Sequence, residues 1–257
     1  MNRIHPSSVV HADAMLGDDI EIGPFCTVGP EVQLGDGCRL ISHVVIEGPE
    51  TTIGKNNTFY PFCIIGIDPQ DLQYHQERTR LVVGDGNVFR ESVSVHRGSV
   101  KGGETRIGHD NLLMGYVHVA HDCILGNHNI LASYVGLSGH VMIDDYVTLG
   151  GRVGVVQFFR IGSYAYIGGG SVIDKNVPPY ASGYGNRLKI KSINIVGLKR
   201  HGFSRDAIHA ISDAHRLYFR SDLSKGEALQ QIEETLGSVE EVRLFTEFLK
   251  AVGGKVN

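Results

Sequence analysis

The stretch VAHDCILGNHNILASYVGLSGHVMIDDYVTLG, which spans Val119–Gly150, repeats one pattern every six residues. A large aliphatic residue leads each hexad, in the order Val119, Leu125, Leu131, Leu137, Ile143 and Leu149. The same register continues without a break from Ile107 to Ile173, giving twelve aliphatic leads. A period this short is typical of β-helices, in which short parallel strands joined by tight turns stack into coils.

The fifth position of most hexads holds a small residue, most often valine or cysteine. All four cysteines of the chain occupy this position: Cys26, Cys38, Cys63 and Cys123. A position that alternates between valine and cysteine indicates core packing, because a buried free cysteine behaves as a small apolar residue. We therefore expect neither disulfides nor a cysteine metal site.

Three hexads make one triangular coil, so each residue lies about 4.8 Å below the residue 18 positions later. The register fails where Asp71, Glu77 and Lys101 take lead positions, since a charged side chain is costly in a core. We expect loops at about 67–81 and 97–106, on the wall of a rigid coil, where binding sites are commonly built.

The hexads end after the sequence Val177-Pro178-Pro179, and helical spacing follows. Apolar residues then recur three or four positions apart, as in Ala207, Ile211, Ala214 and Tyr218. Capping boxes beginning at Ser224 and Ser238 predict two helix starts. The predicted organisation is a β-helix over residues 1–185 and a helical domain over residues 190–257.

The overall composition excludes several classes of protein. The net charge of −4 argues against a nucleic-acid partner, which needs a basic surface. No apolar run approaches the length of a membrane span, and the first residues lack the apolar core of a secretory signal. We therefore expect a cytoplasmic protein without an integral membrane segment.

One column of the predicted coil combines groups that suit acyl transfer. His121 is the third residue of the Val119 hexad, and the residues 18 and 36 positions later are Gly139 and Gln157. An imidazole beside a glycine amide offers a base and a donor to a developing oxyanion. Asp122 can orient the imidazole only if a turn brings these neighbouring side chains to the same side.

Several longer strings give the chain a specific resemblance that covers nearly its whole length: IGPFCTVGP (22–30), SVSVHRG (92–98), DNLLMGYVHVAHDC (110–123), LSGHV (137–141), VPPY (177–180) and NIVGLKRHGFSRDAI (194–208). The chain resembles the UDP-N-acetylglucosamine O-acyltransferases of lipid A biosynthesis, which are hexapeptide-repeat acyltransferases. The resemblance implies an all-β left-handed parallel β-helix with a C-terminal α-helical domain, assembled as a homotrimer. It also implies transfer of an (R)-3-hydroxyacyl group from acyl carrier protein to the 3-hydroxyl of a UDP-sugar. The expected reaction needs no metal and no cofactor beyond the phosphopantetheine of the carrier protein.

The resemblance also assigns roles to individual residues. His121 is the implied general base, Asp122 its partner and Gly139 the oxyanion donor. The implied substrate-binding residues are Asp71, Gln73, His118, His140, Gln157, Asn194 and Arg200, the last two for the nucleotide. Gly169 lies where the family measures the length of the acyl chain.

Three positions depart from the family pattern: Gln73 replaces a lysine, Val156 a histidine and Val196 a glutamate. The changes are compatible with drift, or with a 3-amino sugar nucleotide as acceptor, which would give an amide. A different class is a trimeric zinc enzyme resembling β-helical carbonic anhydrases, with His96, His118, His121 and His140 as candidate ligands. A non-catalytic scaffold is a third alternative, and the column of His121 and Gly139 argues against it.

Overall fold

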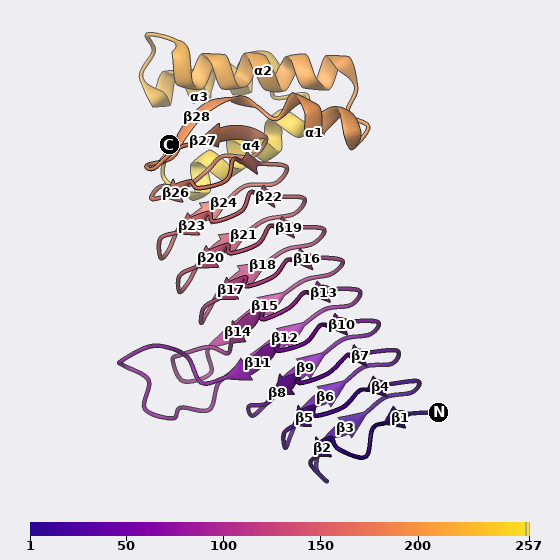
Figure 1. Ribbon diagram of the computed structural model, residues 1–257. Helices are drawn as coiled ribbons and strands as arrows, with labels where there is room; N and C mark the ends of the chain where they lie inside the picture. Colours follow the sequence, from indigo (N-terminus) through magenta and orange to yellow (C-terminus); the bar gives the residue numbers. More distant parts are fainter. Residues whose placement is uncertain (255, 257) are drawn as a thin grey trace.

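The computed structural model describes residues 1–254 and 256, which form a left-handed parallel β-helix with a helical domain at its C-terminal end (Figure 1). Three sheets, here called faces A, B and C, form the walls of the coil. Face A contains β1 (Arg3–Ile4), β4 (Glu21–Ile22), β7 (Arg39–Leu40), β10 (Thr58–Phe59), β13 (Val88–Phe89), β16 (Leu112–Leu113), β19 (Ile130–Leu131), β22 (Thr148–Leu149), β25 (Tyr166–Ile167), β27 (Ala181–Tyr184) and β28 (Lys189–Ile193).

Faces B and C contain the remaining strands, and all of them pair in parallel. Face B contains β2 (Val9–Val10), β5 (Thr27–Val28), β8 (Val45–Ile46), β11 (Ile64–Ile67), β14 (Ser94–His96), β17 (His118–Val119), β20 (Gly136–Leu137), β23 (Gly154–Val155) and β26 (Val172–Ile173). Face C contains β3 (Met15–Leu16), β6 (Gln33–Leu34), β9 (Thr51–Ile53), β12 (Arg80–Val83), β15 (Glu104–Ile107), β18 (Ile124–Leu125), β21 (Met142–Ile143) and β24 (Arg160–Ile161).

The hexad leads and the small fifth residues fill the interior of the coil. His118 pairs with Gly136 and Val119 with Leu137, which is the predicted spacing of 18 residues. The aliphatic leads are almost completely buried, and so are the four cysteines, none of which is paired in a disulfide. The prediction that the cysteines are packing residues is therefore confirmed.

The turns between faces depend on a left-handed backbone at the fourth residue of each hexad. At the corner between faces B and C, this residue is Asp122, His140 or Phe158, with φ values of 58°, 60° and 68°. Asparagine and aspartate tolerate this conformation best, and larger residues are held there by the stacked coils. The turn rotates successive side chains out of the alternation of a strand, so neighbours in sequence can meet.

A buried asparagine ladder supports face A, and the periodicity did not reveal it. Asn57, Asn87, Asn111 and Asn129 occupy equivalent positions in successive coils and are almost fully buried. Each Oδ1 accepts the backbone N–H of the next member, and Asn129 Oδ1 accepts Val147 N at the end. The ladder satisfies buried backbone donors at one corner of the coil.

Two loops interrupt the coils at the B–C corner. Residues 68–79, between β11 and β12, contain no strand, and their projection from the coil is visible in Figure 1. The second loop covers residues 97–103 and is shorter than the range 97–106 given above, because β15 begins at Glu104. Both loops therefore stand on the same edge of the molecule.

The C-terminal helices are α1 (Ile195–Arg200), α2 (Arg205–Arg220), α3 (Lys225–Leu236) and α4 (Glu240–Ala251). They pack on one another around Ile211, Tyr218, Ile232 and Phe245. The capping box at Ser224 is confirmed, whereas the box at Ser238 is wrong, because Val239 precedes α4 without a side-chain cap. The boundary placed at residue 190 falls inside β28, which pairs antiparallel with β27. In the described part of the chain, no helix is both long and apolar enough to cross a bilayer.

Candidate active site

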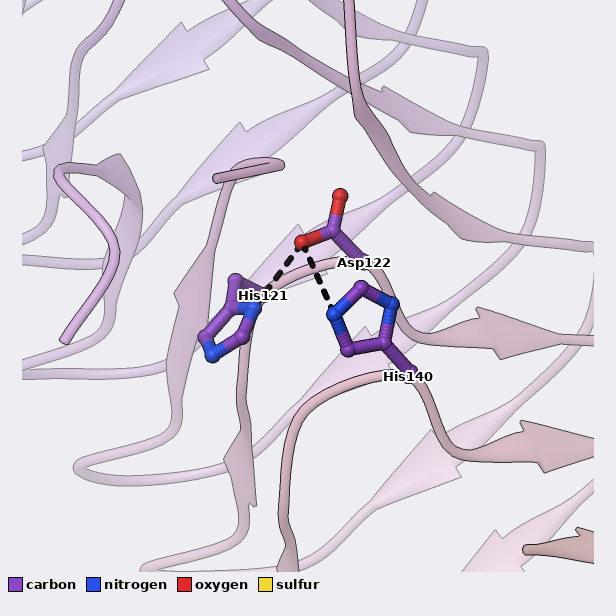
Figure 2. Close-up of side chains that lie close together, drawn as sticks. All are labelled: His121, Asp122 and His140. Carbon is purple, nitrogen blue, oxygen red and sulfur yellow. Dashed lines mark hydrogen bonds and ion pairs between the residues drawn. The ribbon is translucent and has the colours of Figure 1, made fainter. Parts of the chain in front are cut away.

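The corner between β17 and β18 brings His121 and Asp122 into direct contact. His121 Nδ1 lies 2.9 Å from Asp122 Oδ2, and both side chains are about nine-tenths buried (Figure 2). The left-handed backbone at Asp122 produces this contact between consecutive residues. A carboxylate at Nδ1 favours a proton on that nitrogen, which leaves Nε2 as the acceptor.

Ser99 holds Asp122 from the coil before it, and the hexad pattern contained no signal for this residue. The Ser99 amide and hydroxyl both donate to Asp122 Oδ2, at 3.0 and 2.8 Å. Asp122 N in turn donates to Thr105 Oγ1 at 2.8 Å. Ser99 and Thr105 are both buried, so the carboxylate that contacts His121 has a fixed position.

Gly139 lies directly against the His121 ring, one coil further along. A Cβ at position 139 would lie 2.4 Å from His121 Cε1 and 2.7 Å from Nε2. Only glycine therefore fits beside the ring in this position. Within the described part of the chain, the Gly139 amide donates no hydrogen bond, so it is available to a ligand.

Two further histidines border this centre. His140 Nε2 lies 3.7 Å from Asp122 Oδ2, and its ring stands edge-on to that of His121, with 5.3 Å between centroids (Figure 2). His118 Nδ1 lies 2.8 Å from Ser94 Oγ, and its ring meets His96. Burial lowers the pKa of His118 and of His96, so both rings are neutral near pH 7.

The 68–79 loop brings Asp71 to the same corner. Asp71 Oδ1 accepts Gln73 N at 3.0 Å, and this bond is the largest cause of a lowered pKa at Asp71. The charges of His121 and His140 also lower the pKa of Asp71. Asp71 is therefore an ionised carboxylate at the corner that carries the two imidazoles. The Gln73 side chain is exposed.

A shallow groove of about 290 Å³ runs along the outer side of face B. Its lining residues are His118, Gly136, Leu137, Ser138, Gly154, Val155, Val156 and Val172. Gly136 and Gly154 leave the floor open, since a Cβ on either would meet no atom within 4 Å. Gln157 continues the column of His121 and Gly139, with its side chain exposed.

Within one chain, the structure does not bring three of the residues implied by the resemblance to His121: Asn194, Arg200 and Gly169. Asn194 caps α1: its Oδ1 accepts Gly197 N and its Nδ2 donates to Tyr164 O. Arg200 and Val196 lie exposed on α1, at the C-terminal end of the coil (Figure 1). Gly169 lies at the A–B corner between β25 and β26, across face B from His121.

The four candidate zinc ligands separate into two pairs, His96 with His118 and His121 with His140. The described residues contain one group with suitable spacing for an ion, formed by His121, Asp122 and His140, whose ligand atoms lie within 4.8 Å of one another. Asp122 Oδ2 already accepts from His121 and twice from Ser99. A metal there would compete with the contact that orients the His121 ring.

Two sequence families match this chain. The family described as Udp N-acetylglucosamine O-acyltransferase, domain 2, matches residues 176–255, and the bacterial transferase hexapeptide repeat matches residues 104–139. A curated relative is the acyl-[acyl-carrier-protein]--UDP-N-acetylglucosamine O-acyltransferase of Syntrophobacter fumaroxidans. It is 44% identical over 249 residues, which are 96% of each protein.

Solved structures give the same result. The UDP-N-acetylglucosamine O-acyltransferase of Moraxella catarrhalis superposes with a TM-score of 0.93 at 43% identity, covering 96% of both chains. The UDP-N-acetylglucosamine acyltransferase of Francisella novicida superposes with a TM-score of 0.95 at 36% identity, covering 99% of this chain and 93% of the other. Both similarities extend over the coil and the helical domain together.

Proposed function

The chain belongs to the UDP-N-acetylglucosamine O-acyltransferase family, and on that basis we propose that it catalyses the first step of lipid A biosynthesis. In this reaction an (R)-3-hydroxyacyl chain moves from acyl carrier protein to the 3-hydroxyl of UDP-N-acetylglucosamine. The observation that carries the proposal is the contact of His121 with Asp122 at Nδ1 and with Gly139 at its opposite edge.

The geometry supports a simple sequence of steps. His121 Nε2 takes the proton of the sugar 3-hydroxyl while its oxygen attacks the thioester carbonyl carbon. The carbonyl oxygen becomes an oxyanion, to which the Gly139 amide donates a hydrogen bond. The C–S bond then breaks, and His121 returns the proton to the departing phosphopantetheine thiolate. Asp122 stabilises the imidazolium between the two steps.

Each substrate has a proposed place at the B–C corner and on face B. The ionised Asp71 and neutral His118 suit hydrogen bonds to sugar hydroxyls, and the groove over Gly136 and Gly154 suits an apolar chain. The acyl donor is acyl carrier protein carrying phosphopantetheine, and no metal or other cofactor takes part. Asn194 and Arg200 contact the nucleotide.

The expected assembly is a homotrimer in the cytoplasm. His121 lies at an edge of the coil, so a wall from a second copy would close the site. Arg200 and Gln157 are exposed in the single chain, as residues at such a site would be.

The amide-forming alternative is not favoured, because the relatives from Syntrophobacter fumaroxidans and Moraxella catarrhalis are named as O-acyltransferases. Nothing in the structure explains why Val196 replaces an acidic residue. The zinc alternative is opposed by the hydrogen bonds that already occupy Asp122 Oδ2.

The test is incubation of the purified chain with (R)-3-hydroxyacyl carrier proteins of several lengths and UDP-N-acetylglucosamine, with products identified by mass. The expected product loses its acyl chain in mild base, as an ester does and an amide does not. Absence of any acylated sugar nucleotide with active carrier-protein donors would overturn the proposal.

A further inference from the structure

The motif SVSVHRG (92–98) contains an arginine that the proposed reaction does not use. Arg97 follows β14, and its side chain is 7% exposed, which is unusual for a charged group. Its guanidinium donates to three partners: Gly66 O at 3.0 Å, Tyr74 OH at 2.7 Å and the carboxylate of Asp68. All three partners belong to the 68–79 loop or to the strand that leads into it.

The start of the loop is built around this arginine. β11 pairs with β14 through a bulge at Gly66, which has a φ of 83° and leaves its carbonyl free to accept from Arg97. A side chain at position 66 would collide with Glu47 O, 2.2 Å from the added Cβ. His96 Nδ1 also bonds to Asp68 O at 2.5 Å. Two consecutive residues of the motif thus hold the first residue of the loop.

Tyr74 fixes the loop from its middle. Its hydroxyl accepts from Arg97 and donates to Glu77 O at 3.2 Å, and its ring lies under the guanidinium, 5.6 Å from the ring centroid to Cζ. Tyr74 N donates to Asp71 O at 3.1 Å, closing a tight turn over residues 71–74. Asp71 is therefore held between two residues that are both bonded to Arg97, namely Asp68 and Tyr74.

We propose that Arg97 is a positioning residue that holds the 68–79 loop on the coil, so that Asp71 stays at the acceptor side of His121. The inference rests on the proposed function in one respect, namely that the ligand of Asp71 is a hydroxyl-rich sugar nucleotide. The Arg97 side chain bonds to neither His121 nor Asp122 among the described residues, and its hydrogen bonds all go to the 68–79 loop or its base.

The chemistry of the contact requires arginine. A guanidinium donates in several fixed directions at once, whereas a lysine ammonium is a compact charge on a flexible stem. A lysine at position 97 could keep the ion pair with Asp68 but would not reach Gly66 O and Tyr74 OH from the same position. Loss of the Tyr74 bond alone should loosen the turn that carries Asp71 and leave the ion pair intact.

Two variants weaken the contacts that hold the 68–79 loop and leave the catalytic residues unchanged. They are Arg97→Lys and Tyr74→Phe, the second of which removes one hydroxyl and keeps the ring. The matched control is Arg80→Gln, because Arg80 is half-exposed and its side chain pairs with Glu104 on the neighbouring strand. Each protein is assayed for turnover and for hydrogen exchange of the amides of residues 71–77. The exchange measurement needs no substrate.

For Tyr74→Phe we expect about a tenfold rise in KM for UDP-N-acetylglucosamine, the size of one lost charge-assisted hydrogen bond. The KM for the acyl donor, kcat and the pH profile should stay as in the wild type. Amides 71–77 should exchange faster in both loop variants, with unchanged exchange in the coil and in Arg80→Gln. In an Asp71→Asn background, Tyr74→Phe should add little, since both changes act through Asp71.

Unchanged hydrogen exchange of amides 71–77 in both loop variants would overturn the proposal. A kinetic effect confined to kcat or to the KM for the acyl donor would overturn it as well. A tenfold rise in the KM for UDP-N-acetylglucosamine when Tyr74→Phe is added to Asp71→Asn would also contradict the proposal. If the wild-type chain fails to acylate the sugar nucleotide, the proposed function fails, and the exchange result alone then decides whether Arg97 holds the loop.

Discussion

His121 and Asp122 are consecutive residues, yet Nδ1 of the first lies 2.9 Å from Oδ2 of the second. The left-handed backbone at Asp122 turns the two side chains toward each other, and Ser99 holds the carboxylate in place. The pair therefore owes its geometry to the corner of the coil, where the chain leaves face B for face C.

Replacing His121 with alanine should reduce kcat by about 10²–10⁴-fold, the usual contribution of a positioned general base. Asp122→Asn should cost less, about 10–100-fold, because a bond to a charged partner contributes about 1.5–3 kcal/mol. Single-turnover rates would measure both effects, and unchanged thermal unfolding would show that the fold is intact. A His121→Ala enzyme with more than a tenth of wild-type kcat would exclude the role of base.

Gly139→Ala should damage both stability and turnover through one contact. The added methyl would lie 2.4 Å from His121 Cε1, so the ring must move, at a cost of about 1–3 kcal/mol for such overpacking. Combined with His121→Ala, the same change should cost little stability, because the colliding ring is gone. Urea unfolding of the two single variants and the double variant measures this coupling. Additive losses would show that position 139 excludes a side chain for another reason.

The repeat made the coil predictable, since a period of six fixes which residues point inward and which stack 18 positions apart. The same period places Gly139 against His121 from the sequence alone. The six-residue period describes the regular coils and gives no information about the contacts made by the two loops that interrupt them. Ser99 and Arg97 both lie in the 97–103 loop, so the period could not predict their bonds to Asp122 and to the 68–79 loop. In the single chain the Asn194 side chain caps α1, and the contact with the nucleotide that the resemblance implies stays a prediction.

Stability should depend on pH through His215, which lies in α2 and is almost fully buried, with its ring tilted against that of Phe219. Burial lowers its pKa from 6.5 to about 4, and its Nε2 has no hydrogen-bond partner among the described residues. Between those two values the unfolded chain binds more protons, so stability is complete above about pH 6.5 and falls as the pH drops toward 4. The loss should approach about 3 kcal/mol. Denaturant titrations at pH 4.5 and 7.5 would measure the difference in unfolding free energy, which should be smaller for His215→Leu than for the wild type. An unchanged difference would assign the pH dependence to other groups.

Gly169→Met should shift the donor preference toward shorter acyl chains. The longer side chain would occupy space at the A–B corner, and each excluded CH₂ loses about 0.8 kcal/mol of burial. A Cβ at position 169 would lie 2.9 Å from Gly151 O, so the backbone must also adjust and total activity should fall. The informative quantity is therefore the ratio of rates with long and short donors. Gly226→Met, on the α3 surface where a Cβ meets nothing within 4 Å, is the control. An unchanged ratio would place the limit on chain length elsewhere, for example at Val172 in the face B groove.

Ser99→Ala should impair turnover only through Asp122. The variant loses the hydroxyl bond to Asp122 Oδ2 and keeps the bond from its own amide, so the carboxylate gains freedom without losing all support. We expect kcat to fall about tenfold or less, as for one bond to a charged acceptor. In an Asp122→Asn background the same change should have almost no effect, because the carboxylate that Ser99 positions is already absent. Thr105→Val, which removes the acceptor of Asp122 N, tests the other side of the same turn. If Ser99→Ala costs as much in the Asp122→Asn background as in the wild type, the hydroxyl acts on the substrates directly and Asp122 is held by the corner alone.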